Sequence, residues 1–163
     1  MADVALVRID SRLIHGQVAT KWLKQVQANR IIVIDNSLAK DPFMKKVYTM
    51  AAPPGIGVEI LDVATAVSSW KKEHLGAGKL MVLFKDVATA ASAWKEGFKF
   101  SALQVGGLGG APGRKTVYQN ITLSAEDAKQ LDEMAKGGVS IIFQTIPEDK
   151  PATFESVIEK VQF

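Results

Sequence analysis

The sequence predicts an α/β fold: an open, mainly parallel sheet with helices on both faces, in a Rossmann-like three-layer sandwich. Apolar runs of strand length alternate with segments of helical periodicity along the whole chain, the order typical of parallel sheets. The run Arg-Ile-Ile-Val-Ile-Asp at 30–35 is nearly all β-branched, as in a strand covered on both faces. The length of 163 residues and the hydrophobic content of 47% fit one domain over 1–163.

The first half of the chain contains two predicted strands and two predicted helices. Residues 4–9 form a short apolar run, and apolar side chains then recur at helical spacing from Gly16 to about Gln27. After the strand at 30–35, Asp41 and Pro42 are typical of a helix N-cap and first turn. That helix carries Phe43, Val47 and Met50 on one face and ends at Pro53-Pro54-Gly55.

An internal similarity follows. Residues 62–71 and 86–95 agree at eight of ten positions with an offset of 24. Each copy follows a strand-like run, at 58–61 and 80–84, and begins with an aspartate suited to an N-cap. Two copies predict consecutive strand–helix units, because a solenoid needs at least three stacked repeats. The tryptophans of the predicted helices are expected to pack against the sheet: Trp22, Trp70 and Trp94.

The second half continues the alternation. We expect a strand at 101–105, a further short strand within 117–123 and another strand at 139–143. Between them, Ser124-Ala-Glu-Asp127 is a capping box for a helix ending near Gly137-Gly138. A last helix is expected to carry Phe154, Val157, Ile158 and Val161.

Composition excludes several functional classes. The chain has no cysteine and only two histidines, which excludes disulfides and thiolate sites and argues against a zinc centre. No apolar run is long enough to span a membrane and no secretory signal begins the chain, so a cytoplasmic location is expected. The net charge is +3, but the lysines are scattered over helix faces rather than clustered with aromatics, so no nucleic-acid binding is expected.

The glycine-rich segment 106–113 invites a nucleotide-binding interpretation, which its spacing does not support. Gly113 is followed by Arg114 rather than Lys-Ser/Thr, and Pro112 stands where a dinucleotide fingerprint needs its third glycine. A lid, a partner-contact loop and a plain connection remain open interpretations.

The most informative stretch is Arg8-Ile-Asp-Ser-Arg-Leu-Ile-His-Gly-Gln-Val18, at a predicted strand-to-helix turn. In a parallel sheet such a turn lies at the carboxyl edge, where ligands bind. A helix starting near Gly16 would offer free amides to a phosphate, and Arg8 and Arg12 would offer positive charge. Asp10 can accept a hydrogen bond from one imidazole nitrogen of His15, which leaves the other as a nucleophile. The residues alone favour phosphorylation of His15 and a structural hinge histidine equally.

The signature at 8–18 resembles the active-site sequence of IIB components in the mannose/fructose/sorbose family of the bacterial sugar phosphotransferase system. The resemblance extends along the chain, through 30–35, Ala-Ala-Pro-Pro-Gly at 51–55, Val-Leu-Phe-Lys at 82–85 and Val-Gly-Gly-Leu at 105–108. Ser11 and Asn36 depart from it, since relatives often have acidic residues there.

The resemblance implies a phosphoryl relay. A phosphorylated IIA protein would donate to Nδ1 of His15, and His15 would pass the group to a sugar carried by the IIC/IID membrane permease, with no metal or diffusible cofactor. Arg8, Asp10, Arg12, Gly16 and Gln17 match signature positions and would bind or orient the phosphoryl group. Neither the sugar nor the oligomeric state is readable from the sequence, although a free-standing relay protein could form a homodimer. The lack of cysteine separates the chain from families whose IIB carries the group on that residue.

Such a relay requires an accessible histidine. We therefore expect His15 to be shallow and exposed, with a rim or partner-contact surface that includes Leu13, Ile14, Asn36, Phe84 and Lys85. The main enzymatic alternative is a phosphatase or mutase with a phosphohistidine. It is disfavoured because Ile14 replaces the arginine of Arg-His-Gly and His74 is expected to cap a helix end. A non-catalytic sensor or interaction domain is the third interpretation.

Overall fold

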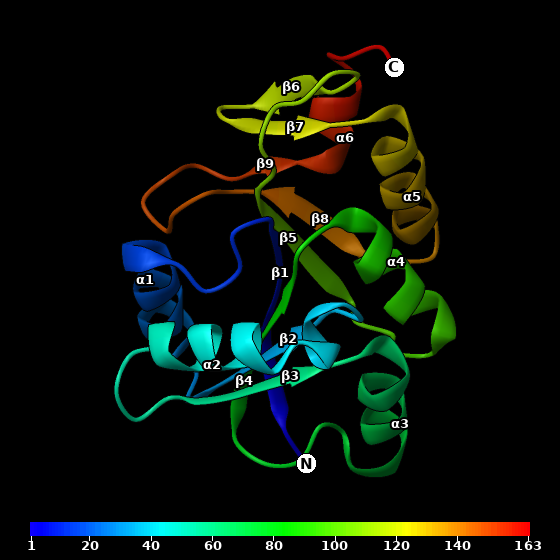
Figure 1. Ribbon diagram of the computed structural model, residues 1–163. Helices are drawn as coiled ribbons and strands as arrows, with labels where there is room; N and C mark the ends of the chain where they lie inside the picture. The colour runs from blue at the N-terminus through cyan, green and yellow to red at the C-terminus, as the bar shows by residue number, and fades with distance from the viewer.

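The computed structural model describes the backbone of residues 1–163 and every side chain except that of Gln17. Its main feature is a seven-stranded sheet in the order β3-β2-β4-β1-β5-β8-β9 (Figure 1). The strands of this sheet are β1 (Asp3–Asp10), β2 (Arg30–Ile34), β3 (Gly57–Leu61), β4 (Lys79–Phe84), β5 (Ala102–Gly107), β8 (Ser140–Phe143) and β9 (Ala152–Thr153). All neighbours pair in parallel except β8 with β9. The predicted open, mainly parallel sheet is confirmed.

Helices cover both faces of this sheet, as predicted. They are α1 (Gly16–Val26), the 3-10 helix η1 (Leu38–Lys40), α2 (Pro42–Ala51), α3 (Val63–Glu73), α4 (Val87–Glu96), α5 (Ala125–Lys136) and α6 (Phe154–Ile158). One core cluster joins the sheet to α3, α4, α5 and α6, and a second joins the opposite face to α1, η1 and α2. In the part of the chain that is described, no helix has the length and apolarity that a membrane crossing requires.

The internal similarity forms α3 and α4, which pack side by side on one face of the sheet. Each helix begins with the expected aspartate cap: Asp62 accepts from the Thr65 amide at 2.6 Å and Asp86 from the Thr89 amide at 2.8 Å. Trp70 and Trp94 are half-buried against the core on this face, and Trp22 of α1 is buried on the other. The predicted packing of all three tryptophans is confirmed.

Two sequence predictions were wrong in detail, and one left open the direction of a helix face. The single strand expected within 117–123 is an antiparallel hairpin of β6 (Lys115–Tyr118) and β7 (Ile121–Leu123), because Gln119 adopts a positive φ of 41° and turns the chain. The last helix ends at Ile158 and excludes Val161. The apolar face of α2 formed by Phe43, Val47 and Met50 points to solvent, since Met44 and Tyr48 make the contacts with the core.

The helix caps supply a direct stability test. Ser124 and Asp127 form the predicted reciprocal capping box, with Asp127 N donating to Ser124 Oγ at 3.0 Å and Ser124 N to Asp127 Oδ2 at 3.2 Å. Replacing Ser124 with Ala should lower the free energy of unfolding by about 1 kcal/mol, because one amide of α5 loses its partner. Urea unfolding measures this change. Ser68→Ala, at an exposed position of α3, serves as control, and an equal loss in both would contradict the cap assignment.

Candidate active site at the carboxyl edge of the sheet

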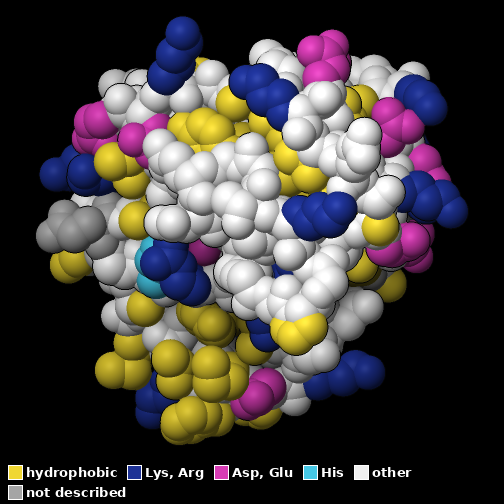
Figure 2. Space-filling view, turned by 90° about the horizontal axis from the view of Figure 1, so that it is seen from above, with side chains coloured by type: hydrophobic (Ala, Val, Ile, Leu, Met, Phe, Trp, Pro, Cys, Tyr) yellow, Lys and Arg dark blue, Asp and Glu magenta, His cyan; other side chains and the backbone are white. Residues whose placement is uncertain are grey.

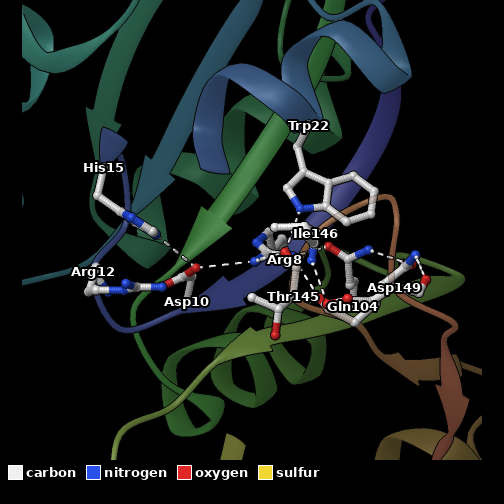
Figure 3. A network of polar contacts seen from close by, with 10 residues as sticks. Arg8, Asp10, Arg12, His15, Trp22, Gln104, Thr145, Ile146 and Asp149 are labelled. Atoms are coloured by element: carbon white, nitrogen blue, oxygen red, sulfur yellow. Dashed lines mark hydrogen bonds and ion pairs between the residues drawn. The ribbon is translucent and has the colours of Figure 1, made fainter. Parts of the chain in front are cut away.

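The candidate site is built around Asp10, the last residue of β1, whose side chain is only 1% exposed. One carboxylate oxygen, Oδ2, lies 3.1 Å from His15 Nε2 and 3.2 Å from Arg8 Nη2. The other, Oδ1, accepts from the Arg12 amide at 3.1 Å and lies 3.6 Å from Arg12 Nε (Figure 3). The sequence prediction that Asp10 holds one imidazole nitrogen therefore agrees with the geometry.

His15 is the N-cap residue of α1, in extended conformation. Its side chain is 20% exposed, so the ring is half-buried rather than deeply enclosed. The sequence analysis expected a more exposed ring. A carboxylate only accepts hydrogen bonds, so Nε2 carries the proton in the neutral ring and Nδ1 keeps a free lone pair. The first amides of α1 also lack intrahelical partners because they begin a helix. The arrangement places a potential nucleophile beside a region favourable to anions.

Arg8 is almost completely buried, which favours the orienting alternative of its predicted role over direct contact with a phosphate at the surface. It is 2% exposed, and its two terminal nitrogens donate to Asp10, to the side chain of Gln104 and to the backbone carbonyls of Gln144 and Thr145 at 3.0 and 2.9 Å. Its Cζ also lies 5.3 Å from the centre of the Trp22 ring. Burial lowers the pKa of Arg8, and the neighbouring Asp10 opposes that shift. Arg8 therefore holds Asp10 in place from inside the core.

Arg12 is the cation available at the surface. Its side chain is 58% exposed while its Nε remains 3.6 Å from Asp10 Oδ1. The flexible end of Arg12 can thus reach an anion at His15 without losing its link to Asp10. The two arginines of the signature therefore differ in burial: Arg8 lies in the core and Arg12 at the surface.

Several rim residues named from the sequence are wrong as partner contacts, because the core covers them. Leu13 is 2% exposed, Ile14 4% and Phe84 0%, so their side chains anchor the site loop and the sheet. Lys85 and Asn36 are exposed. Asn36 Oδ1 accepts from the Val63 amide at 2.9 Å, so it also fixes the start of α3.

The position of Gly16 beside His15 suggested that a side chain would not fit there. The structure gives a different reason for the glycine, its backbone conformation. A Cβ atom at Gly16 would meet nothing within 4 Å, but φ is +43°. Residues with a side chain are strained at such a φ. The side chain of Gln17, another signature residue, lies outside the described residues.

The sequence analysis missed Gly106 and Gly107 as parts of the site. Both belong to β5 rather than to a loop, and they lie under the Arg8 and Asp10 side chains. A Cβ at Gly106 would overlap the Arg8 guanidinium, and a Cβ at Gly107 would lie 2.9 Å from Asp10 Oδ1. A glycine inside a strand often marks such a close approach, and this was the available signal.

The rest of the glycine segment is a loop between β5 and β6 that hydrogen bonds and an ion pair anchor at both ends. Thr122 of β7 donates from its amide to Leu108 O at 3.0 Å and from Oγ1 to Gly109 O at 2.7 Å. Arg114 donates to Thr122 and forms an ion pair with Asp127 at 2.8 Å. As expected from the failed fingerprints, the element after β5 is the strand β6 rather than a helix, and this segment lacks the strand–turn–helix geometry of a nucleotide site.

Among the side chains that the structure describes, neither a second histidine nor a group of metal ligands accompanies His15. His74 is the C-cap of α3, stacked on Trp70 with ring centres 4.7 Å apart. It precedes β4, so it lies at the amino edge of the sheet, opposite His15. This placement argues against the phosphatase interpretation. Among the described side chains, no three histidines or carboxylates gather as metal ligands.

Comparison with known proteins identifies the family. The model of the sorbose-subfamily IIB component of the phosphotransferase system matches residues 4–163. The chain belongs to this IIB family. It is 30% identical over 158 residues to the sorbose-specific EIIB component of Lacticaseibacillus casei, covering 97% of this chain and 96% of that protein.

Other relatives differ in length and in the sugar that they are named for. The mannose-specific EIIAB component of Escherichia coli is 28% identical over 97% of this chain, but only 49% of its own length is covered. The chain thus spans about half of that relative. The fructose-specific EIIB component of Bacillus subtilis is 26% identical, with 99% of both chains covered.

Solved structures of IIB proteins share the whole fold. The crystal structure of manxB from Thermoanaerobacter tengcongensis superimposes with a TM-score of 0.91 at 37% identity, covering 98% of this chain and 97% of that one. The IIBSor domain of the Klebsiella pneumoniae sorbose permease gives the same TM-score at 28% identity, with 99% of both chains covered. The three-layer arrangement is therefore that of known IIB domains.

Proposed function

We propose that this IIB protein, as a single domain over residues 1–163, is a phosphocarrier of a phosphoenolpyruvate-dependent sugar phosphotransferase system. It accepts a phosphoryl group from a phosphohistidine of a IIA protein on Nδ1 of His15. It then transfers the group to a sugar that passes through the IIC/IID permease. In enzymatic terms it is a protein-phosphohistidine–sugar phosphotransferase that acts beside the membrane.

The observation that carries this proposal is the 3.1 Å contact between His15 Nε2 and Asp10 Oδ2. It leaves Nδ1 unprotonated and therefore nucleophilic. Phosphoryl transfer needs an in-line nucleophile and stabilised equatorial oxygens more than it needs acid–base catalysis. The amides at the start of α1 and the exposed guanidinium of Arg12 supply that stabilisation.

The two transfers balance without a cofactor. In the first, the bond between phosphorus and the donor imidazole breaks while a bond between phosphorus and His15 Nδ1 forms. In the second, the phosphorus–Nδ1 bond breaks while a bond to a sugar hydroxyl oxygen forms, and the hydroxyl proton leaves to a base on the acceptor side. Asp10 neutralises the positive charge that the phosphorylated imidazole develops at Nε2.

The sugar belongs to the class for which the relatives are named: sorbose, mannose, fructose or N-acetylgalactosamine. His15 touches only the phosphoryl group in this scheme, so the permease selects the sugar. The IIA partner is expected to be another protein or another part of the same polypeptide, as the name EIIAB indicates for the mannose-specific relatives.

The test is phosphorylation with phosphoenolpyruvate, the general phosphotransferase proteins and the IIA partner. Wild type should acquire an acid-labile phosphoryl label, and His15→Ala should acquire none, because the nucleophile is missing. His74→Ala is the matched control and should be labelled like wild type, since His74 lies at the opposite edge of the sheet. Equal labelling of His15→Ala and wild type would refute the proposal.

A further inference from the structure

Helix α2 carries an apolar face that no part of the described chain covers. Phe43 is 73% exposed, Val47 41% and Met50 74%. These three side chains, the outer stripe, follow one another at helical spacing along one side of α2. Figure 2 shows the resulting hydrophobic region at its lower left, on the side where α2 lies at the front of Figure 1.

The fold itself does not use the outer stripe. Helix α2 packs on the sheet through Met44 and Tyr48, and none of its residues is buried. Isolated apolar side chains are common at surfaces, but a contiguous stripe of large ones is typical of protein interfaces. Two of the three, Phe43 and Met50, are of types enriched at interface cores.

The stripe adjoins the candidate active site. Leu13 and Ile14, which precede His15, belong to the same core cluster as Leu38, Met44 and Tyr48. The site loop and α2 therefore cover the same face of the sheet and share one core cluster. A protein large enough to bring a phosphorylated side chain to His15 from this side would also meet α2.

The charge beside the stripe indicates the chemistry of its partner. Lys40 and Lys46 are exposed and Lys45 is half-exposed. Two carboxylates lie near these lysines, Asp41, which caps α2 through the Met44 amide, and Asp62, which caps α3 through the Thr65 amide. The three lysines outnumber them, so the border of the stripe is net positive. A second copy of this chain would bring like-charged lysines together around the stripe, which opposes pairing. An acidic border on the partner would be complementary instead.

We infer that the outer stripe of α2 is the docking surface for the phosphoryl-donating IIA protein, which meets it with an apolar groove bordered by carboxylates. This inference rests on the proposed phosphocarrier function. It assigns to α2 the recognition of the donor and leaves the chemistry to His15, Asp10 and Arg12. A small phosphoryl donor such as phosphoramidate would need no such surface.

The test uses the double variant Phe43→Ser/Met50→Ser, whose exposed side chains contribute little to the core. The initial rate of His15 phosphorylation is measured against the concentration of phosphorylated IIA and, separately, with phosphoramidate. The donor concentration for half-maximal rate should rise about tenfold or more, as for two interface anchor residues. The rate with phosphoramidate should equal that of wild type. Phe163→Ser, another exposed aromatic, is the control and should change neither rate.

Charge reversal gives a second, independent measurement. Lys45→Glu/Lys46→Glu should also raise the half-saturating donor concentration and should weaken its dependence on salt, because complementary charges mainly affect association. An unchanged donor dependence in both double variants would overturn the docking inference. So would a loss of self-association, or of binding to phosphatidylcholine–phosphatidylglycerol vesicles, with donor dependence unchanged. If neither IIA nor phosphoramidate phosphorylates wild type, the proposed function itself fails.

Discussion

Gly106→Ala is expected to destabilise the protein by about 3 kcal/mol or more, because the new methyl group would occupy the place of the buried Arg8 guanidinium. Arg8 cannot move aside without cost. Its terminal nitrogens hold Asp10, Gln104 and two backbone carbonyls, and displacing it would leave these buried acceptors without their donors. Thermal unfolding should show a Tm lower by about 10 °C for a chain of this size.

Gly110→Ala is the matched control, because a Cβ there meets nothing within 4 Å and Gly110 follows the same strand. A double-mutant cycle adds a stricter criterion. In an Arg8→Ala background the cost of Gly106→Ala should fall substantially, since the overlapping group is gone. Additive losses, or equal Tm values for Gly106→Ala and Gly110→Ala, would show that the close approach to Arg8 is not what requires a glycine.

The order of strands and helices was predictable because buried parallel strands and helix N-caps have recognisable local sequence patterns. The run at 30–34 is β-branched and became the buried β2, and the aspartates at 62 and 86 cap α3 and α4. The site loop was predictable for a similar reason, since Asp10 and His15 are polar side chains placed directly behind an apolar strand. Local patterns of this kind depend on residues close in sequence, so they can be recognised without a structure.

Contacts between distant strands could not be predicted in the same way. Arg8 pairs in register with Gln104, 96 residues away. The sequence does contain a hint, because Gln104 and Gln144 are polar residues within or directly after apolar strand runs, and a buried polar side chain needs a partner. Which partner it has depends on strand order, and the order β1-β5-β8 appears only in the fold. For this reason the sequence pointed to the positive charge of Arg8 but not to its buried contacts with Gln104 and Gln144.

The apolar stripe of α2 shows a different limit. Periodicity correctly grouped Phe43, Val47 and Met50 on one face, but helical spacing alone does not tell whether a stripe faces the core or a partner. Met44 and Tyr48 form a second, inward stripe one position further along the helix. When a helix has two apolar faces, only one of them packs against the core. The structure is needed to tell which face is buried and which is exposed.

Asp10→Asn is expected to lower the rate of His15 phosphorylation about 100-fold or more, because an amide cannot replace both acceptor oxygens of the carboxylate. Oδ2 faces His15 Nε2 and Arg8 Nη2, while Oδ1 faces the Arg12 amide. An amide nitrogen in the first position would face two donors. The imidazole would then shift its proton to Nδ1 so that Nε2 could accept, which blocks the proposed nucleophile.

The alternative orientation of the new amide is no better. Its nitrogen would then face the Arg12 amide and the Arg12 side chain, 3.1 and 3.6 Å from the present Oδ1. In both orientations the charge between the two arginines is lost. The site loop would therefore lose the bond that keeps Arg12 next to His15, which should weaken stabilisation of the phosphoryl oxygens as well.

Two measurements separate these effects from simple unfolding. Nitrogen-15 NMR of the folded variant should find the proton of neutral His15 on Nδ1, whereas wild type should carry it on Nε2. Rates with IIA and with phosphoramidate should fall together, because the defect lies in the nucleophile rather than in donor recognition. Asp86→Asn is the matched control: it makes the same change at the same edge of the sheet, in an exposed N-cap where asparagine serves equally well. A variant with the wild-type tautomer and rate would refute the role assigned to Asp10, since nothing else at that carboxylate fixes which nitrogen of His15 is free.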